Sequence, residues 1–107
     1  MKLDENTLRR GRFDVALKVR RISDLELAIG DMERTLAALT VFVASEERRT
    51  RITDVNHFAY STAANAGIER SNRLKRSIAE LKATRAAAVV ERDRAQESFT
   101  ALRTAAQ

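Results

Sequence analysis

A strict three-and-four alternation of apolar residues between positions 22 and 43 constrains the fold of this chain more than any other feature. The spacing places one narrow apolar stripe along one face of an α-helix, which is typical of a coiled-coil seam. An amphipathic helix lying on a globular core is less favoured, because no other segment supplies such a core. The alternation is unbroken over three heptads and consists of Ile22, Leu25, Ile29, Met32, Leu36, Leu39 and Val43.

A second apolar alternation follows in the C-terminal half of the chain. Its frame is interrupted between residues 82 and 98, where Arg85 and Arg92 would fill a seam badly. A stutter that brings Val89 inward fits the sequence equally well, so the register beyond Leu81 stays open. The residues of this second seam are Leu74, Ile78, Leu81, Phe99 and Leu102.

Between the two seams, the part of the chain with least heptad character predicts a hinge. We expect an all-α fold, a long antiparallel two-helix coiled-coil hairpin that forms a single domain over residues 1–107. The expected limits are about 5–51 for helix 1, about 52–62 for the hinge and about 63–105 for helix 2.

Charge supports folding back at the hinge. Residues 22–47 carry six acidic side chains and one Arg, whereas the antiparallel partner region at about 67–92 is strongly basic. Opposite charges beside a seam specify the partner and its orientation. Each exposed pair contributes only about 0–1 kcal/mol, but the block pattern disfavours a parallel self-dimer.

Composition limits the classes of function. The chain has no Cys, which excludes disulfides and Cys-ligated metal sites. Its longest uncharged run, residues 55–68, is too short and too polar to span a bilayer, and the first residues lack the apolar core of a signal peptide. We therefore expect a cytoplasmic protein without a cofactor. A net charge of +5 predicts attraction to something acidic.

The two chain ends are expected to form a basic, loosely packed end of the hairpin. Gly11 and Lys18 occupy seam positions of helix 1, and Arg92 and Ala95 occupy those of helix 2. None of these four fills a seam as a large apolar side chain would.

A catalytic interpretation would have to use Asp54, His57 and Ser61. A two-helix hairpin lacks the oxyanion hole and the water-excluding pocket that a nucleophilic site needs. We expect instead that Asp54 or Thr53 caps a turn and that His57 hydrogen-bonds locally. One His and no Cys also argue against a metal site, so the chain is expected not to be an enzyme.

Several apolar residues lie where neither seam can use them. In the register of Ile22, the side chains of Phe13, Leu27 and Val41 fall on the face opposite the seam, and Leu17 and Phe42 flank that face. Single exposed apolar residues are common, so this pattern fits either a scattered surface or a face that meets another protein.

Two short motifs resemble a known family. Residues 52–60, Ile-Thr-Asp-Val-Asn-His-Phe-Ala-Tyr, and residues 72–77, Asn-Arg-Leu-Lys-Arg-Ser, are similar to the alphaproteobacterial branch of the FliJ flagellar export proteins. In that branch Ile-Ser-Asp-Pro-x-His-Phe-Ala-Tyr-Pro joins two long helices and Asn-Leu-Lys-Arg-Ser opens the second. The chain departs from the pattern at Val55 and Ser61, where the family has prolines, and by one residue inserted in the second motif. Without the prolines, helix 2 is expected to be free to begin before Tyr60.

The resemblance implies an antiparallel coiled coil similar to the stalk of rotary ATPases. Its implied partners are the hexameric flagellar export ATPase, the membrane-embedded export gate and substrate chaperones, at the cytoplasmic face of the inner membrane. No small molecule is implied. The alternatives are a basic nucleic-acid-binding hairpin and a generic coiled-coil adaptor or chaperone. The hypothesis assigns the ATPase ring to Arg9, Arg10, Arg12 and Phe13, and the gate or a chaperone to His57, Phe58 and Tyr60.

Overall fold

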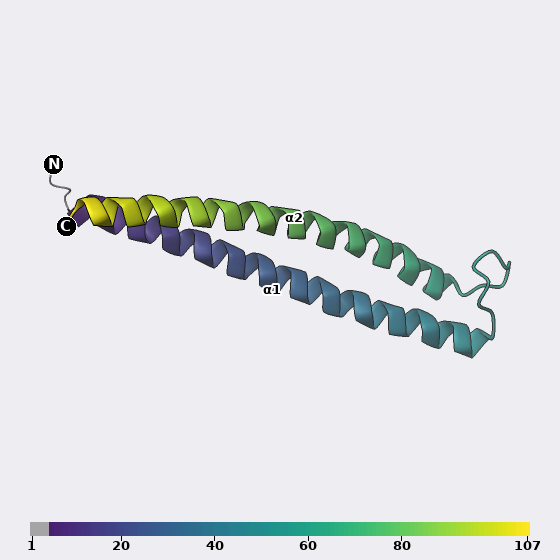
Figure 1. The fold of residues 1–107 in the computed structure, drawn as a ribbon. Coiled ribbons are helices and arrows are strands. Elements are labelled where there is room, and N and C mark those ends of the chain that lie inside the picture. Colours follow the sequence, from purple (N-terminus) through teal and green to yellow (C-terminus); the bar gives the residue numbers. More distant parts are fainter. Residues whose placement is uncertain (1–4) are drawn as a thin grey trace. The chain divides into compact units, whose positions relative to one another are not determined.

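The computed structural model describes residues 5–107, and these residues contain two long helices and no strand. Helix α1 spans Glu5–Thr50 and helix α2 spans Thr62–Ala105. They run in opposite directions and are joined by a loop of residues 51–61 (Figure 1). The all-α helical hairpin predicted from the heptad pattern is therefore confirmed.

The hairpin divides into two compact units. One, here called the terminal unit, comprises residues 5–27 and 82–107 of the described chain. The other, called the hinge unit, comprises residues 28–81 and includes the loop. Each unit contains a segment of α1 packed against a segment of α2.

In the terminal unit, the inner side of α2 follows the heptad frame from Ala88 to Leu102. Ala88 and Phe99 are buried, and Arg92, Ala95 and Leu102 are half-buried at the intervening positions. These five residues follow the alternation of four and three. Arg85, the frame position before Ala88, is exposed, and Val89 is half-buried, so Val89 also contributes to the inner side as the stutter would have it.

The same unit corrects the expectation of loose packing at Gly11. A Cβ atom added to Gly11 would lie 3.0 Å from Cδ2 of Phe99 and 3.9 Å from Cδ1 of Leu102. The Phe99 ring thus occupies the space that a side chain at Gly11 would need. The seam is filled here because an aromatic residue on one helix compensates for a glycine on the other.

The hinge unit repeats this arrangement with the helices exchanged. A Cβ atom on Gly67 would lie 3.0 Å from Cγ2 of Val43 and 3.6 Å from the ring of Phe42. Ala64 and Gly67 are buried and Ser71 is half-buried, so the seam of α2 begins about ten residues before Leu74. The pairs Gly11–Phe99 and Val43–Gly67 are both centred on position 55, so each unit has the same antiparallel register.

The expected seam residues all lie on the inner sides of the helices. Those that are buried are Ile22, Ile29, Ile78 and Phe99. Those that are half-buried are Leu25, Met32, Leu36, Leu39, Val43, Leu74, Leu81 and Leu102.

Both helices end at the loop through recognisable capping. Arg51 follows the last residue of α1 with φ of 61°, and its N–H donates to the carbonyl of Glu47 at 2.8 Å, which is the left-handed C-terminal motif. Ser61 precedes α2, and its Oγ accepts from the N–H of Ala64 at 3.1 Å as an N-cap does. Since α2 begins at Thr62, the expectation that helix could start before Tyr60 is wrong.

Candidate interaction surfaces

The loop of the hinge unit is ordered by its own hydrogen bonds. Oδ1 of Asp54 accepts from the N–H of Asn56 at 2.9 Å, and the carbonyl of Asp54 accepts from the N–H of His57 at 3.0 Å. Nδ1 of His57 accepts from the N–H of Ala59 at 3.0 Å, and its carbonyl accepts from the N–H of Tyr60 at 3.0 Å. The local roles expected for Asp54 and His57 are those observed.

This ordered loop presents an aromatic pair. The rings of His57 and Phe58 stack with centroids 4.7 Å apart, and Phe58 is 95 % exposed. Because Nδ1 of His57 accepts a hydrogen bond, the neutral imidazole carries its proton on Nε2. An aromatic side chain that an ordered turn exposes to solvent does not stabilise the hairpin itself. Phe58 is therefore the strongest candidate for partner contact in the loop.

Tyr60 has a different position from Phe58. Its side chain is half-buried, and its hydroxyl donates to Oε2 of Glu47 at 2.8 Å. Burial, and then the hydrogen bond to Glu47, raise the pKa of Tyr60 above its usual range. The hydroxyl thus ties the loop to α1, and only the remaining surface of Tyr60 is available to a partner.

A second hydrogen bond between the loop and α1 lies beside that of Tyr60. Arg49 Nε donates to Oε2 of Glu46 at 2.6 Å, and Ser61 Oγ donates to Oε1 of the same carboxylate at 3.4 Å. The hydrogen bond from Arg49 is the main reason that the pKa of Glu46 lies below its ordinary value of 4.5. Asp54, His57 and Ser61, the residues of the catalytic alternative, are thus each engaged in local capping or helix-to-loop bonds.

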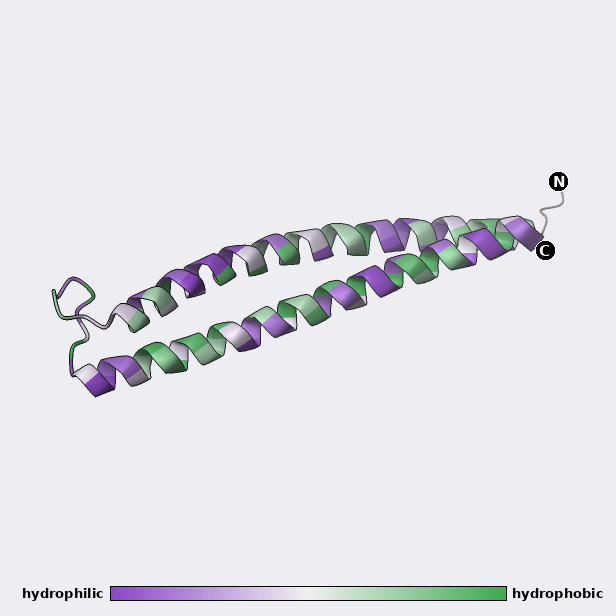
Figure 2. Cartoon of the chain, turned by 180° about the vertical axis from the view of Figure 1, so that it is seen from behind, coloured by the Kyte–Doolittle hydropathy of each residue, from purple (hydrophilic) through white to green (hydrophobic). Residues whose placement is uncertain are grey.

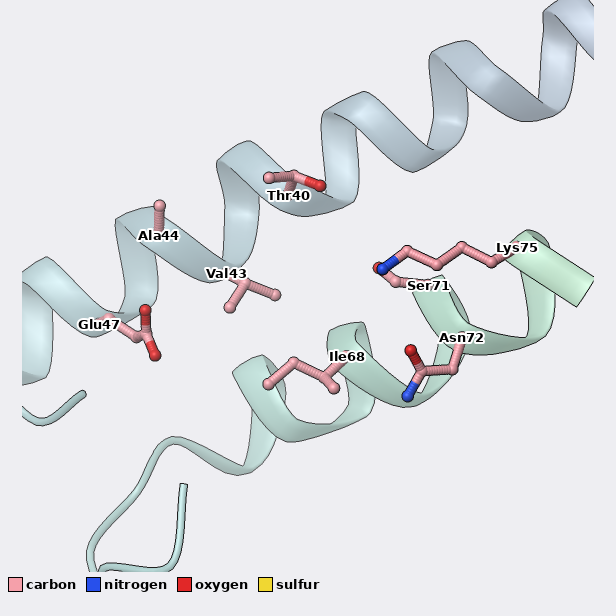
Figure 3. A pocket seen from close by; sticks show the side chains of 8 residues that line it. All are labelled: Thr40, Val43, Ala44, Glu47, Ile68, Ser71, Asn72 and Lys75. Atoms are coloured by element: carbon pink, nitrogen blue, oxygen red, sulfur yellow. The ribbon is translucent and has the colours of Figure 1, made fainter. Parts of the chain in front are cut away.

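Next to the loop, a shallow groove of about 300 Å³ lies between the two helices of the hinge unit. Figure 3 shows Val43 of α1 and Ile68 of α2 on opposite sides of this groove, with Glu47 toward one end of it and Lys75 entering from the other. Small seam residues of α2 leave this space, since Ser71 cannot fill it. The groove is lined by Thr40, Val43, Ala44, Glu47, Ile68, Ser71, Asn72 and Lys75.

In the terminal unit, the arginines predicted to bind a partner are exposed. Arg9 and Arg10 project into solvent, and Phe13 is 64 % exposed. The guanidinium carbon of Arg12 lies 5.9 Å from the centroid of the Phe99 ring, and that of Arg103 lies 5.8 Å from it. Both are cation–π distances, so Arg12 also stabilises the seam. A depression of about 260 Å³ is lined by Glu5, Leu8, Arg9 and Arg12.

The positive charge is concentrated in this unit. Residues 5–27 and 82–107 hold eleven Lys or Arg against seven Asp or Glu, whereas residues 28–81 hold eight against seven. Ion pairs join Asp14 to Lys18, Asp31 to Arg34, Glu46 to Arg49 and Asp93 to Arg92, each within one helix. The net positive field of the chain therefore comes mainly from the terminal unit.

The described residues contain neither a candidate membrane span nor a candidate metal-binding cluster. Over residues 5–107, neither helix has a stretch both long enough and apolar enough to cross a membrane. Within the same residues, His, Asp and Glu side chains do not gather in groups of three that could hold a metal ion.

Comparisons with known proteins add no assignment. No family model matches the chain, and neither a curated protein nor a solved structure matches it.

Proposed function

We propose that this protein is a non-enzymatic component of flagellar type III export that acts as FliJ proteins do. It is a coiled-coil stalk that enters the hexameric export ATPase, promotes its assembly and activity, and links it to the export gate and to substrate chaperones. In this proposal it works at the cytoplasmic face of the inner membrane and is held there only by its partners.

The observation that carries the proposal is the coincidence of the hinge motif with the turn of a two-helix hairpin. The motif at residues 52–60 is the one that resembles the family, and it forms the loop between α1 and α2. The antiparallel hairpin is the fold that the resemblance implies. Exposure of Phe58 within the motif gives the loop a contact residue.

Charge supports assigning the ATPase to the terminal unit. Its excess of four positive charges favours an acidic partner, and Arg9 and Arg10 are exposed on it. Phe13 is exposed near them and adds apolar contact area. Arg12 contributes to the same end of α1, although part of its role is to cover Phe99.

The first experiment measures stimulation of the purified export ATPase by the full-length chain. Charge reversal at Arg9, Arg10 and Arg12 is expected to reduce stimulation by about tenfold or more, as loss of several charge-assisted contacts would. Reversal at Arg70, Arg73 and Arg76, three exposed arginines of the hinge unit, is the matched control. Unchanged stimulation in the first variant, with circular dichroism showing an intact helix content, would refute the ATPase assignment.

The second experiment measures binding to the cytoplasmic domain of the export gate and to substrate chaperones. Phe58→Ala should weaken one of these interactions by about tenfold to a hundredfold, as truncation of an aromatic anchor does. Phe13→Ala serves as the control, because it removes an exposed Phe outside the hinge unit. Equal binding by both variants and the original chain would refute the assignment of the loop to the gate or a chaperone.

A basic nucleic-acid-binding hairpin is the second candidate, and the charge excess of the terminal unit is what favours it. It predicts binding to duplex DNA with an affinity that falls steeply as salt rises. Capture of the export ATPase in a pull-down, without salt-dependent DNA binding, would decide for the first candidate. Capture of another complex only would decide for a generic adaptor.

A further inference from the structure

A segment of α1 in the hinge unit is uncharged for eleven residues. Residues 35–45 contain no Asp, Glu, Lys or Arg, although charged residues make up 33 % of the chain. One side of this segment packs on α2 through Leu36, Leu39 and Val43. Val41 on the other side is 66 % exposed and Phe42 is 43 % exposed. Figure 2 shows hydrophobic positions recurring along this part of α1.

A helix that is apolar around most of its circumference is normally covered on more than one side. In the hairpin only the seam side is covered, so a second face of α1 is left without a partner in the described chain. Ala37 and Ala38 are exposed on it beside Val41. Such small side chains permit close approach of another helix axis.

The exposed face has its own heptad stripe. Its six members are spaced alternately three and four residues apart and are all exposed: Asp31, Arg34, Ala38, Val41, Ser45 and Arg48. The centre of the stripe is small or apolar, and its two ends carry opposite charges. All six members lie in the hinge unit.

From this pattern we infer that the stripe is an antiparallel interface with a second copy of this chain. A two-fold axis midway between positions 39 and 40 makes the stripe self-complementary. It places Ala38 against Val41 at the centre and Asp31 against Arg48 at both ends. A parallel pairing would place Asp31 on Asp31 and Arg48 on Arg48, so the end charges select the antiparallel arrangement.

The groups required for the end contacts are accessible. Arg48 is exposed and forms no ion pair within residues 5–107. Asp31 is paired with Arg34 of its own helix, but its side chain is 74 % exposed, and a carboxylate accepts more than one donor. Arg34, Asp31 and the Arg48 of the partner copy would form a three-membered network.

The contact runs from position 31 to position 48, which is about 25 Å of helix. A single helix pair of this length is a small interface, so the dimer should form reversibly with rising concentration. The inference does not depend on flagellar export, because it uses only the charge and exposure of α1 in the hinge unit.

The test is sedimentation equilibrium of the full chain over a range of concentrations. The unmodified chain should show a monomer–dimer equilibrium. Val41→Asp should abolish it, since a carboxylate would be buried against Ala38 of the second copy. Leu27→Asp is the matched control, because Leu27 is 64 % exposed on the same face of α1 but lies four residues before the stripe begins, where the antiparallel pairing would set it against position 52, beyond the end of α1. It should leave the dimer unchanged.

A charge exchange tests the antiparallel register. Asp31→Lys and Arg48→Asp should each weaken association by about tenfold, because each turns two end pairs from attractive to repulsive. An equimolar mixture of the two variants should recover it, since a mixed dimer regains opposite charges at both ends. Asp24→Lys, on the same face but seven residues before the stripe begins, is expected to have no effect.

Circular dichroism of every variant shows whether the helices remain formed, so loss of dimer is separable from loss of fold. A chain that stays monomeric at all concentrations overturns the inference. So does equal weakening by Val41→Asp and Leu27→Asp, or failure of the mixture to recover association. ATPase stimulation that survives Val41→Asp would leave the proposed function standing while the dimer is absent.

Discussion

At the scale of single residues, each unit contains a glycine faced by a bulky side chain of the other helix. Gly11 faces Phe99 and Gly67 faces Val43, in both cases with 3.0 Å between the neighbour and an added Cβ. Gly30 differs, because a Cβ there would meet only the flexible end of Arg34 at 3.4 Å. Glycine is therefore used for close packing at two positions and not at the third.

These contacts predict different outcomes for the same substitution. Gly30→Ala should raise the free energy of unfolding by about 1 kcal/mol, the ordinary helix preference of Ala over Gly. Gly67→Ala should raise it less or lower it, because the new methyl group crowds Val43. Urea denaturation of both variants gives the comparison. Equal gains at the two sites would contradict the packing described for Gly67.

Arg51 holds a left-handed backbone conformation, with φ of 61°. This conformation costs an L-residue about 1–2 kcal/mol, which Gly avoids. Gly also raises the conformational entropy of the unfolded chain, which offsets part of this gain. Arg51→Gly should therefore stabilise the hairpin by about 0.5–1 kcal/mol. Arg48→Gly, inside the helix, should destabilise it by about 1 kcal/mol. Thermal melts of the two variants should shift in opposite directions.

The ties between loop and helix make stability depend on pH in two windows. The lowered pKa of Glu46 means that its contribution is present above its ordinary value of 4.5 and is lost as the pH falls through the folded value. The raised pKa of Tyr60 means that its contribution is present below its ordinary value of 10.0 and is lost as the pH rises. Acid and alkali should therefore loosen the same junction.

Tyr60→Phe tests the alkaline window. The variant should be less stable than the original chain at neutral pH, because its hydrogen bond to Glu47 is missing. It should also show a smaller fall in melting temperature above pH 10 than the original chain, since no phenol remains to ionise in the unfolded state. A parallel decline of both proteins between pH 9 and 11 would argue against the role of this hydroxyl.

At the scale of the helices, the two faces of α1 differ in what they contribute to stability. Ile22 is 7 % exposed at the seam, whereas Leu27 is 64 % exposed on the opposite side. Ile22→Ala should lower the free energy of unfolding by about 2–4 kcal/mol. Leu27→Ala should change it by no more than about 0.5 kcal/mol. Chemical denaturation measures both, and a large loss at Leu27 would show that the outer face is covered in solution.

At the scale of the whole molecule, the uneven distribution of charge predicts that the two proposed partner contacts differ in their salt dependence. Binding through the terminal unit should weaken markedly between 50 and 300 mM salt, because screening acts on its excess of four positive charges. Binding that depends on Phe58 should change little, since burial of an aromatic ring is not screened. Titrations of the two proposed partners, the export ATPase and the gate domain, at several salt concentrations would reveal the difference. Identical salt dependence for both would contradict the division.

The fold class could be predicted from the amino-acid sequence alone. Every a and d position from Ile22 to Val43 is apolar, so this face of the helix must pack against another segment. The sequence has no other core-forming segment, which leaves the second helix of the same chain as the partner. The position of the hinge could also be predicted, because the heptad periodicity of apolar residues is interrupted there. The local bonds of Asp54 and His57 were predictable from their capping chemistry.

How the weak parts of the seam are filled could be seen only in the packing of the two helices. In a heptad pattern, Gly11 and Gly67 leave the seam unfilled. The periodicity shows which residues face the other helix, but not which side chain of that helix contacts them. Phe99 and Val43 fill this space from the opposite helix, and which residues face each other depends on how the two helices are aligned. For the same reason, the link between Tyr60 and Glu47 was visible only once both helices were placed.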